Sequence, residues 1–133
     1  MDRGEVKILL VDDSVTMLRA VSNSLVKFCE IPLQNIFTAE NGEEGLKVFD
    51  TVTPHLIISD WNMPIMNGLE FVGKVREKDS KVTIIMLTTE GERSRVVQAL
   101  KTGVNDYMVK PFTPEIVTKK INIAIDMVAR RYT

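Results

Sequence analysis

Short apolar runs alternate along the chain with segments whose apolar residues recur at helical spacing. The runs are continuous and rich in β-branched residues, which is typical of strands covered on both faces. They predict five strands, at 6–11, 35–39, 56–59, 82–87 and 107–109.

A segment of helical period follows each run. Ser14 is the predicted N-cap of the first helix, and its predicted inward positions are Val15, Leu18, Val21, Leu25 and Phe28. Asn41-Gly42 predicts a turn, and a short helix around Leu46 and Phe49 follows it.

Two more helices are predicted over about 68–77 and 92–101. Thr113 and Pro114 read as the N-cap and first turn of a last helix that runs to about Arg130. Its apolar face is predicted to consist of Val117, Ile121, Ala124 and Val128.

Strands that alternate with helices predict an α/β fold, a parallel sheet with helices on both faces. The chain contains no internal repeat, linker or low-complexity tract. We therefore expect residues 1–133 to form a single domain with no attached output domain.

Composition excludes several classes of protein. Lys plus Arg number 17 and Asp plus Glu number 18, so no basic excess favours nucleic acid as the main partner. Cys29 is the one cysteine, which rules out an internal disulfide and fits a reducing compartment. No apolar run approaches the ~20 residues of a membrane span. We expect a soluble cytoplasmic protein that binds neither nucleic acid nor membrane.

Polar side chains follow four of the five predicted strands. Asp12 and Asp13 follow the first strand, Asp60 the third, Thr88 the fourth and Lys110 the fifth. Because ligands of open α/β sheets bind outside the carboxyl ends of the strands, these residues are predicted to share one cleft.

The predicted cleft has the chemistry of phosphoryl transfer. Two carboxylates ~5 Å apart repel by about 3 kcal/mol at an effective dielectric of ~20, and Mg²⁺ is the cation that suits carboxylates combined with phosphate oxygens. Lys110 adds a fixed positive charge and Thr88 a hydroxyl donor. Asp60 is the candidate nucleophile, because the end of a buried strand exposes it yet holds it rigidly.

Four strings around these residues resemble the receiver domains of response regulators. They are "LLVDDS", "ISDWNMPIMNGLE", "IIMLTTE" and "ALKTGVNDYMVKPF". Within that family, "DWNMP" and "NDYMVKPF" are most similar to the single-domain chemotaxis regulators of the CheY type. The resemblance implies a flavodoxin-like five-stranded parallel sheet of order 2-1-3-4-5, a strand order that the alternation of elements alone does not give.

The resemblance also implies roles for the acids and the lysine. Asp60 would be the phosphoacceptor, taking a phosphoryl group from a chemotaxis-type histidine kinase. Asp13, Asp60 and the backbone carbonyl of Asn62 would bind Mg²⁺ directly, and Asp12 largely through a bound water. Lys110 would pair with a phosphoryl oxygen.

The switch and its reset follow from the same resemblance. Thr88 would bond a phosphoryl oxygen, and Tyr107 would turn from an outward to an inward rotamer. The Lys110–Pro111 peptide would be cis. Asn62 and Glu90 are the candidates for setting the dephosphorylation rate, and Thr89, where many relatives carry alanine, is expected to crowd the phosphoryl group.

The expected output is binding of the flagellar motor switch protein. The readout surface would be formed by the fourth helix, the fifth strand and the last helix. A histidine kinase, the motor switch protein and a phosphatase are the partners that the resemblance suggests, and we expect a monomer. The chain would be a regulator rather than an enzyme, with only self-directed phosphoryl transfer and autodephosphorylation.

Three alternative functions compete with this interpretation. A stand-alone receiver could serve as a phosphate sink or relay without motor binding. An aspartate-nucleophile phosphatase would need a second acid two residues after the nucleophile, where Asn62 stands. An FMN carrier would need an anion-binding loop where Asp12 and Asp13 stand. Outside the cleft, His55 is expected on a surface loop at the opposite end of the sheet, and Trp61 is expected to be partly exposed.

Overall fold

The computed structural model describes residues 1–89, 93–111 and 113–132. One parallel sheet has the order β2-β1-β3-β4-β5, as the resemblance implies. Its strands are β1 (Ile8–Val11), β2 (Ile36–Ala39), β3 (Leu56–Asp60), β4 (Thr83–Thr88) and β5 (Asp106–Val109). The helices are α1 (Val15–Cys29), α2 (Gly42–Val52), α3 (Gly68–Lys78), α4 (Arg93–Thr102) and α5 (Pro114–Arg131). Two short 3₁₀ helices, η1 (Arg3–Glu5) and η2 (Leu33–Asn35), were not predicted.

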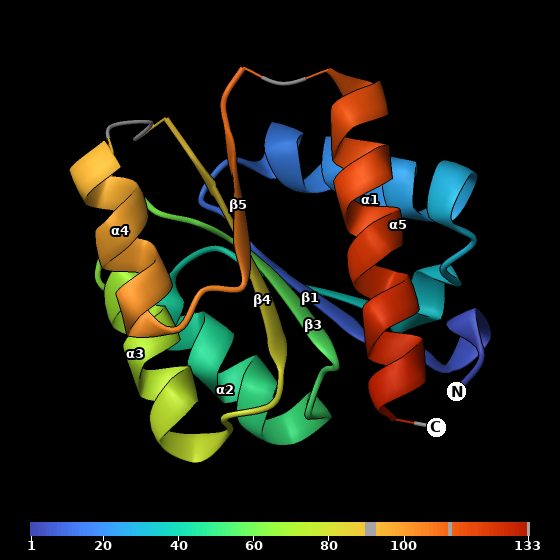
Figure 1. Cartoon of the computed structure of the whole chain (residues 1–133), viewed down its shortest axis with the longest axis horizontal. Coiled ribbons are helices and arrows are strands. Elements are labelled where there is room, and N and C mark those ends of the chain that lie inside the picture. Colours follow the sequence, from blue (N-terminus) through green and yellow to red (C-terminus); the bar gives the residue numbers. More distant parts are fainter. Residues whose placement is uncertain (90–92, 112, 133) are drawn as a thin grey trace.

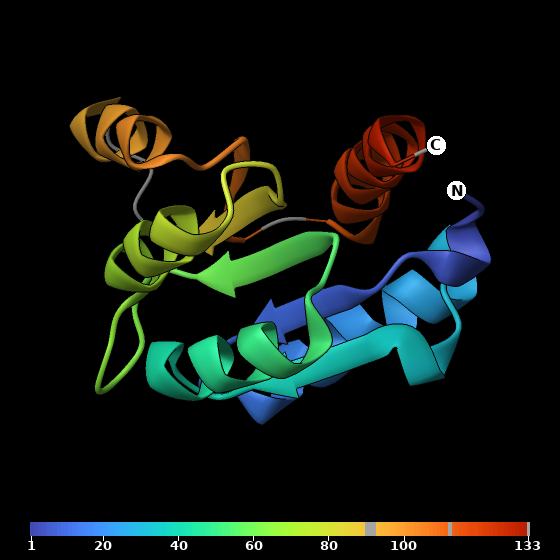
Figure 2. The same ribbon diagram turned by 90° about the horizontal axis from the view of Figure 1, so that it is seen from below.

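The helices form two layers around the sheet. Helices α1 and α5 cover one face, and α2, α3 and α4 cover the other (Figures 1 and 2). The central strands are therefore buried on both sides, which explains why their sequences are continuously apolar. In the described part of the chain, no helix is long and apolar enough to cross a membrane.

Successive residues of β1 enter different cores. Ile8 and Leu10 belong to the core under α1 and α5, whereas Leu9 and Val11 belong to the core under α2, α3 and α4. This follows from the alternation of side chains along a strand. Because β1 packs into both cores, the end of this strand is held in place from both faces of the sheet.

The prediction for the buried face of α1 is wrong at both ends of the helix. Val15 is 47% exposed and Phe28 is 51% exposed. Leu18, Val21, Leu25 and Cys29 are the buried positions of this helix. Cys29 faces the core in place of Phe28, and the ammonium group of Lys27 lies over the outward Phe28 ring.

Side-chain caps fix the starts of the helices near the strand ends. Ser14 Oγ accepts a hydrogen bond from the Met17 N–H, and Thr113 accepts one from the Ile116 N–H, as predicted. Asn41 was predicted to form a turn with Gly42, but it is the N-cap of α2 and accepts from the Glu44 N–H. The predicted start of α4 at Glu92 lies outside the described residues.

Candidate functional site

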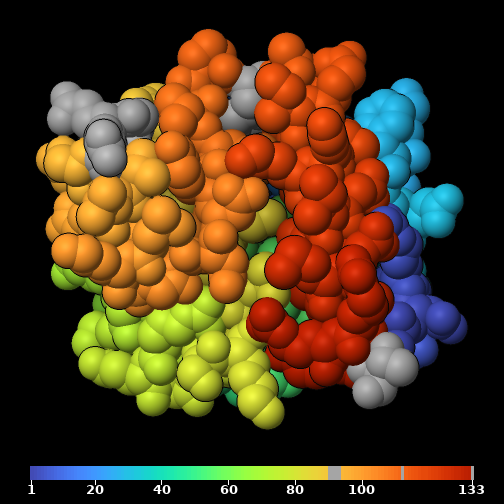
Figure 3. Space-filling model, viewed as in Figure 1, coloured from blue at the N-terminus to red at the C-terminus, as the bar shows by residue number. Residues whose placement is uncertain are grey.

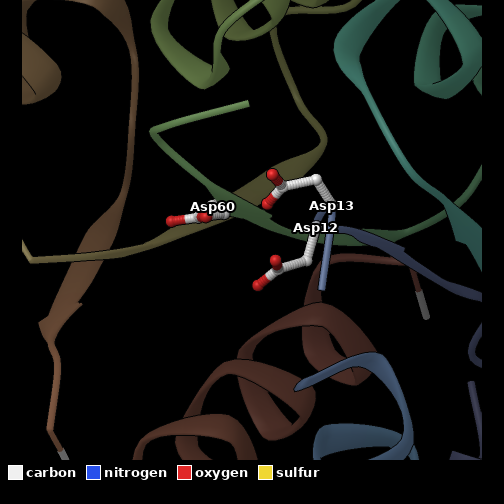
Figure 4. Close-up of side chains that lie close together, drawn as sticks. All are labelled: Asp12, Asp13 and Asp60. Carbon is white, nitrogen blue, oxygen red and sulfur yellow. The ribbon is translucent and has the colours of Figure 1, made fainter. Parts of the chain in front are cut away.

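Three carboxylates converge at the carboxyl end of the sheet. Asp60 is the last residue of β3, and Asp12 directly follows Val11, which pairs with Ser59 of β3. One carboxylate oxygen from each of Asp12, Asp13 and Asp60 lies within 4.8 Å of the others. Figure 4 shows the three side chains pointing into a common space. Parallel register thus brings the first and third strand ends together, as predicted.

Lys110 provides the cation of this cluster. Its Nζ lies 3.5 Å from Asp12 Oδ2 and 3.4 Å from Asp60 Oδ1. Its backbone N–H donates to the Thr88 carbonyl at 2.7 Å, and the peptide bond between Lys110 and Pro111 is cis. One ammonium group therefore pairs with two of the three carboxylates.

Burial, together with repulsion from a neighbouring carboxylate, raises the pKa of Asp12 and of Asp60. Asp60 is 7% exposed and Asp12 is 4% exposed. Desolvation raises the pKa of Asp60, the negative charge of Asp12 raises it further, and Lys110 lowers it in part. Desolvation also raises the pKa of Asp12, opposed by the Ser14 N–H that donates to it and by Lys110. The lysine therefore compensates only part of the cost of gathering the carboxylates.

The backbone around Asp60 is held by hydrogen bonds on both sides. The Trp61 N–H donates to Asp60 Oδ1 at 2.8 Å and to the Leu87 carbonyl at 3.2 Å. The Gly68 N–H donates to the Trp61 carbonyl at 2.7 Å. A Cβ on Gly68 would lie 2.1 Å from the Asp60 carbonyl oxygen, so only glycine allows this approach between α3 and the end of β3.

The predicted switch residues lie on the neighbouring strands. Thr88 is the buried last residue of β4, and Tyr107, in β5, is half-buried. An open pocket of about 410 Å³ lies beside the acids and is lined by Met17, Thr89, Lys110 and Pro111. This pocket is a route by which a ligand can approach Lys110 from solvent.

The two residues predicted to set the dephosphorylation rate are Asn62 and Glu90, and the structure describes only the first. Asn62 is exposed and lies two residues beyond Asp60. Glu90 lies outside the described residues, so its predicted part in dephosphorylation stays a prediction. Met17, a half-buried residue of α1, was not among the predicted site residues, although it lines the same pocket as Lys110.

The expectation for Trp61 was wrong, and the expectation for His55 was confirmed for its position but not for its exposure. Trp61 is 4% exposed and packs in the core under α2, α3 and α4. His55 lies in the loop before β3, at the opposite end from the acid cluster, as expected, but it is half-buried rather than exposed. Its Nδ1 accepts a hydrogen bond from the Lys7 N–H at 3.0 Å, and its ring contacts Tyr132 edge-on at 4.9 Å.

The acid cluster fits a hard divalent cation. Its donors are carboxylate oxygens from three residues, two of them buried, and their spacing lets one ion contact all three. Mg²⁺ prefers such oxygen ligands, and its charge would offset the burial and the carboxylate repulsion that raise the pKa of Asp12 and of Asp60. The composition of this site thus agrees with a magnesium centre.

Comparisons with known proteins agree with this architecture. Residues 8–122 match the family model "Response regulator receiver domain". The chain is 43% identical to chemotaxis protein CheY1 of Helicobacter pylori over 122 residues, 90% of this chain and 96% of the relative. It is 46% identical to the CheY homolog of Campylobacter jejuni over 121 residues, 86% of this chain and 88% of the relative.

Solved structures give the same result. The chemotaxis response regulator CheY4 of Vibrio cholerae superimposes with a TM-score of 0.77 at 34% identity, covering 90% of this chain and 98% of that one. A BeF3-activated DrrB receiver domain superimposes with a TM-score of 0.80 at 28% identity, covering 91% and 97%.

Proposed function

The chain belongs to the response regulator receiver family and is of the CheY chemotaxis type, and from this premise we propose that it is a phosphorylation-activated switch of the cytoplasm. In this proposal Asp60 accepts a phosphoryl group from a chemotaxis-type histidine kinase. The observation that carries the proposal is the convergence of Asp60, two further acids and Lys110 at one end of the sheet.

The proposed reaction is attack by a carboxylate oxygen of Asp60 on a phosphohistidine. A P–O bond to Asp60 forms while the P–N bond to the kinase imidazole breaks, and the imidazole takes up a proton as it leaves. The Trp61 N–H and Lys110 both contact Oδ1, which supports Oδ2 as the attacking atom. The buried strand end supplies the fixed position that in-line attack requires.

Asp12, Asp13, Asp60 and the backbone carbonyl of Asn62 are the groups that we propose hold Mg²⁺. When bound, the ion neutralises charge on the transferring phosphoryl oxygens. Lys110 provides a second cation for the same oxygens, and its contact with Asp60 supports that role. In dephosphorylation a water attacks the phosphorus atom, the P–O bond to Asp60 breaks, and inorganic phosphate leaves. We assign control of that water to Asn62 and Glu90.

The signal leaves the site through Thr88 and Tyr107. A phosphoryl group on Asp60 gives the Thr88 hydroxyl a new acceptor, so the equilibrium shifts toward the state that makes this contact. Tyr107 pairs with Met86 in the sheet register, two residues before Thr88. We propose that the Tyr107 side chain follows Thr88 inward and changes the surface of α4, β5 and α5.

That surface offers a groove for a partner. A hollow of about 260 Å³ is lined by residues of β5, of the segment after it and of α5, namely Tyr107, Met108, Val109, Pro111, Ile116 and Lys120. Figure 3 shows the hollowed surface between the orange atoms of α4 and β5 and the red atoms of α5. We propose that a segment of the flagellar motor switch protein binds there as a helix in a groove. A receiver that serves only as a phosphate sink is the alternative.

Labelling by acetyl phosphate tests the phosphoacceptor. Wild type should take up label only with Mg²⁺, and Asp60→Asn should take up none. Asp50→Asn is the matched control, because Asp50 is an exposed acid paired with Lys78 on the surface. Label that persists in Asp60→Asn, or that forms equally without Mg²⁺, would contradict the proposal.

A pull-down tests the output. The motor switch protein of the source organism should bind the phosphorylated form more tightly than the unphosphorylated form, and Tyr107→Ala should weaken the binding. Phosphorylation that leaves motor-protein binding unchanged would favour the phosphate sink over the motor regulator.

A further inference from the structure

Arg95 joins helix α4 to the residue beside the phosphoacceptor. The guanidinium carbon of Arg95 lies over the Trp61 ring, 5.7 Å from its centroid. Arg95 is an exposed residue near the start of α4, whereas Trp61 directly follows β3 and is 4% exposed. This geometry is a cation–π contact, for which tryptophan is the best aromatic partner and arginine the commoner cation.

The backbone of Trp61 is bonded to the Asp60 carboxylate itself. Its N–H donates to Asp60 Oδ1, and the same N–H contacts the Leu87 carbonyl of β4. A shift of Trp61 therefore changes both the orientation of the carboxylate and its link to β4. Of the contacts made by the Trp61 ring, the one with Arg95 is formed with a charged side chain that reaches it from solvent.

We propose that Arg95 is a positioning residue for Asp60 that acts through Trp61. The guanidinium covers the indole, holds the ring against the core, and so fixes the N–H that orients the Asp60 carboxylate for attack. The proposal rests on the proposed phosphorylation of Asp60 and adds a physical link between α4 and the acid cluster. This link is separate from the proposed route through Thr88 and Tyr107.

The test is the initial rate of Mg²⁺-dependent labelling by acetyl phosphate. A cation–π contact at a surface changes an equilibrium constant about two- to fivefold, so Arg95→Gln should slow labelling by about that factor. Arg95→Lys keeps a cation that can reach the ring and should restore most of the rate. Lys101→Gln removes the same charge from the last turn of α4 and should leave the rate unchanged.

A double-mutant cycle separates this link from a general effect of charge. In a Trp61→Leu background, Arg95→Gln should have no further effect, because the aromatic face is gone. An equal loss of rate in both backgrounds would overturn the proposal, since Arg95 would then act through its long-range field. If Trp61→Leu does not fold, the fluorescence emission of Trp61 in the Arg95→Gln variant tests the contact instead. Emission that matches wild type, before and after Mg²⁺ and beryllium fluoride are added, would overturn it.

The outcomes distinguish this inference from the proposed function. Failure of wild type to take up label contradicts the phosphoacceptor role, and the positioning role falls with it. Wild type that is labelled normally, with Arg95→Gln labelled equally fast, contradicts only the positioning role.

Discussion

Lys110 Nζ lies 3.4 Å from Asp60 Oδ1, so the proposed phosphoacceptor already has a cationic partner before a phosphoryl group arrives. We expect Lys110→Met to reduce the rate of labelling by acetyl phosphate on the order of 10²-fold, because a fixed charge aimed at the transferring group is lost. Since Lys110 lowers the pKa of Asp60, the remaining activity should also need a higher pH.

Lys78→Met is the matched control for this prediction. Lys78 pairs with Asp50 at 2.8 Å on the α3 surface, so its loss should leave the rate of labelling unchanged. Equal effects of the two substitutions would show that Lys110 contributes only to net charge.

Asp60→Asn should make the metal-free protein more stable. Desolvation and the charge of Asp12 raise the pKa of Asp60, which means that burying its ionised form costs free energy. Asparagine removes the charge and keeps an oxygen that can accept from the Trp61 N–H. We expect the free energy of unfolding at pH 7 to rise by about 1 kcal/mol, and Tm to rise by roughly 3–5 °C.

The pH dependence of this difference has a definite sign. A carboxyl whose pKa is raised by folding binds its proton more readily in the folded state, so wild type gains stability as pH falls through the raised pKa. The advantage of Asp60→Asn should therefore shrink in acid. Mg²⁺ should stabilise wild type and have a weaker effect on the variant. A variant that is less stable than wild type in EDTA would contradict this account.

His55 gives the protein a second pH dependence, at the opposite end of the sheet. Its Nδ1 accepts from the Lys7 N–H, and burial, followed by the charge of Lys7, lowers its pKa. As pH falls, the unfolded chain therefore binds the proton before the folded chain does. Stability should fall as pH drops below 6.5, the ordinary pKa of histidine, and continue to fall until pH reaches the lowered pKa of the folded state. His55→Asn puts an acceptor oxygen near the Nδ1 position and removes the titration.

Urea unfolding between pH 5 and 7 measures this effect. His55 is the one histidine of the chain, so the difference between wild type and His55→Asn isolates its titration. The difference in stability should favour wild type more at pH 7 than at pH 5. A difference that is independent of pH would mean that the Nδ1 contact contributes nothing to the pH response.

The sequence predicted the features that depend on one strand or one helix at a time. Apolar runs located the strands to within two residues, and Ser14 and Thr113 were identified as caps because capping is local chemistry. The acid cluster was predicted because parallel strands must end at the same edge of the sheet. The family resemblance supplied the strand order, which the alternation of strands and helices alone does not fix.

The errors concern contacts between elements that are distant in the chain. Phe28 fits the helical period of α1, but the crossing of α1 with α5 decides that Cys29 faces the core instead. Trp61 belongs to the core under α2, α3 and α4, and Arg95 lies over its ring. His55 lies against Tyr132 near the end of the chain. Periodicity carries no information about these tertiary partners.

Gly68 and Gly73 lie in the same helix but should respond oppositely to alanine. A Cβ on Gly68 would lie 2.1 Å from the Asp60 carbonyl oxygen and 2.8 Å from Trp61 Cα, whereas a Cβ on Gly73 would have Thr102 Cγ2 at 3.9 Å as its nearest contact. Gly68→Ala must push α3 away from the end of β3, and we expect it to cost more than about 3 kcal/mol. Gly73→Ala gains helix propensity and should stabilise by about 0.5–1 kcal/mol.

Chemical denaturation of both variants, with labelling by acetyl phosphate, completes the test. Gly68→Ala should also slow labelling, because the backbone it displaces carries the Asp60 carboxylate and the N–H that orients it. Gly73→Ala should label like wild type, which makes it a control for changes in α3 as a whole. Equal stability of the two variants would contradict the close approach of α3 to Asp60, since that approach is the physical difference between the two positions.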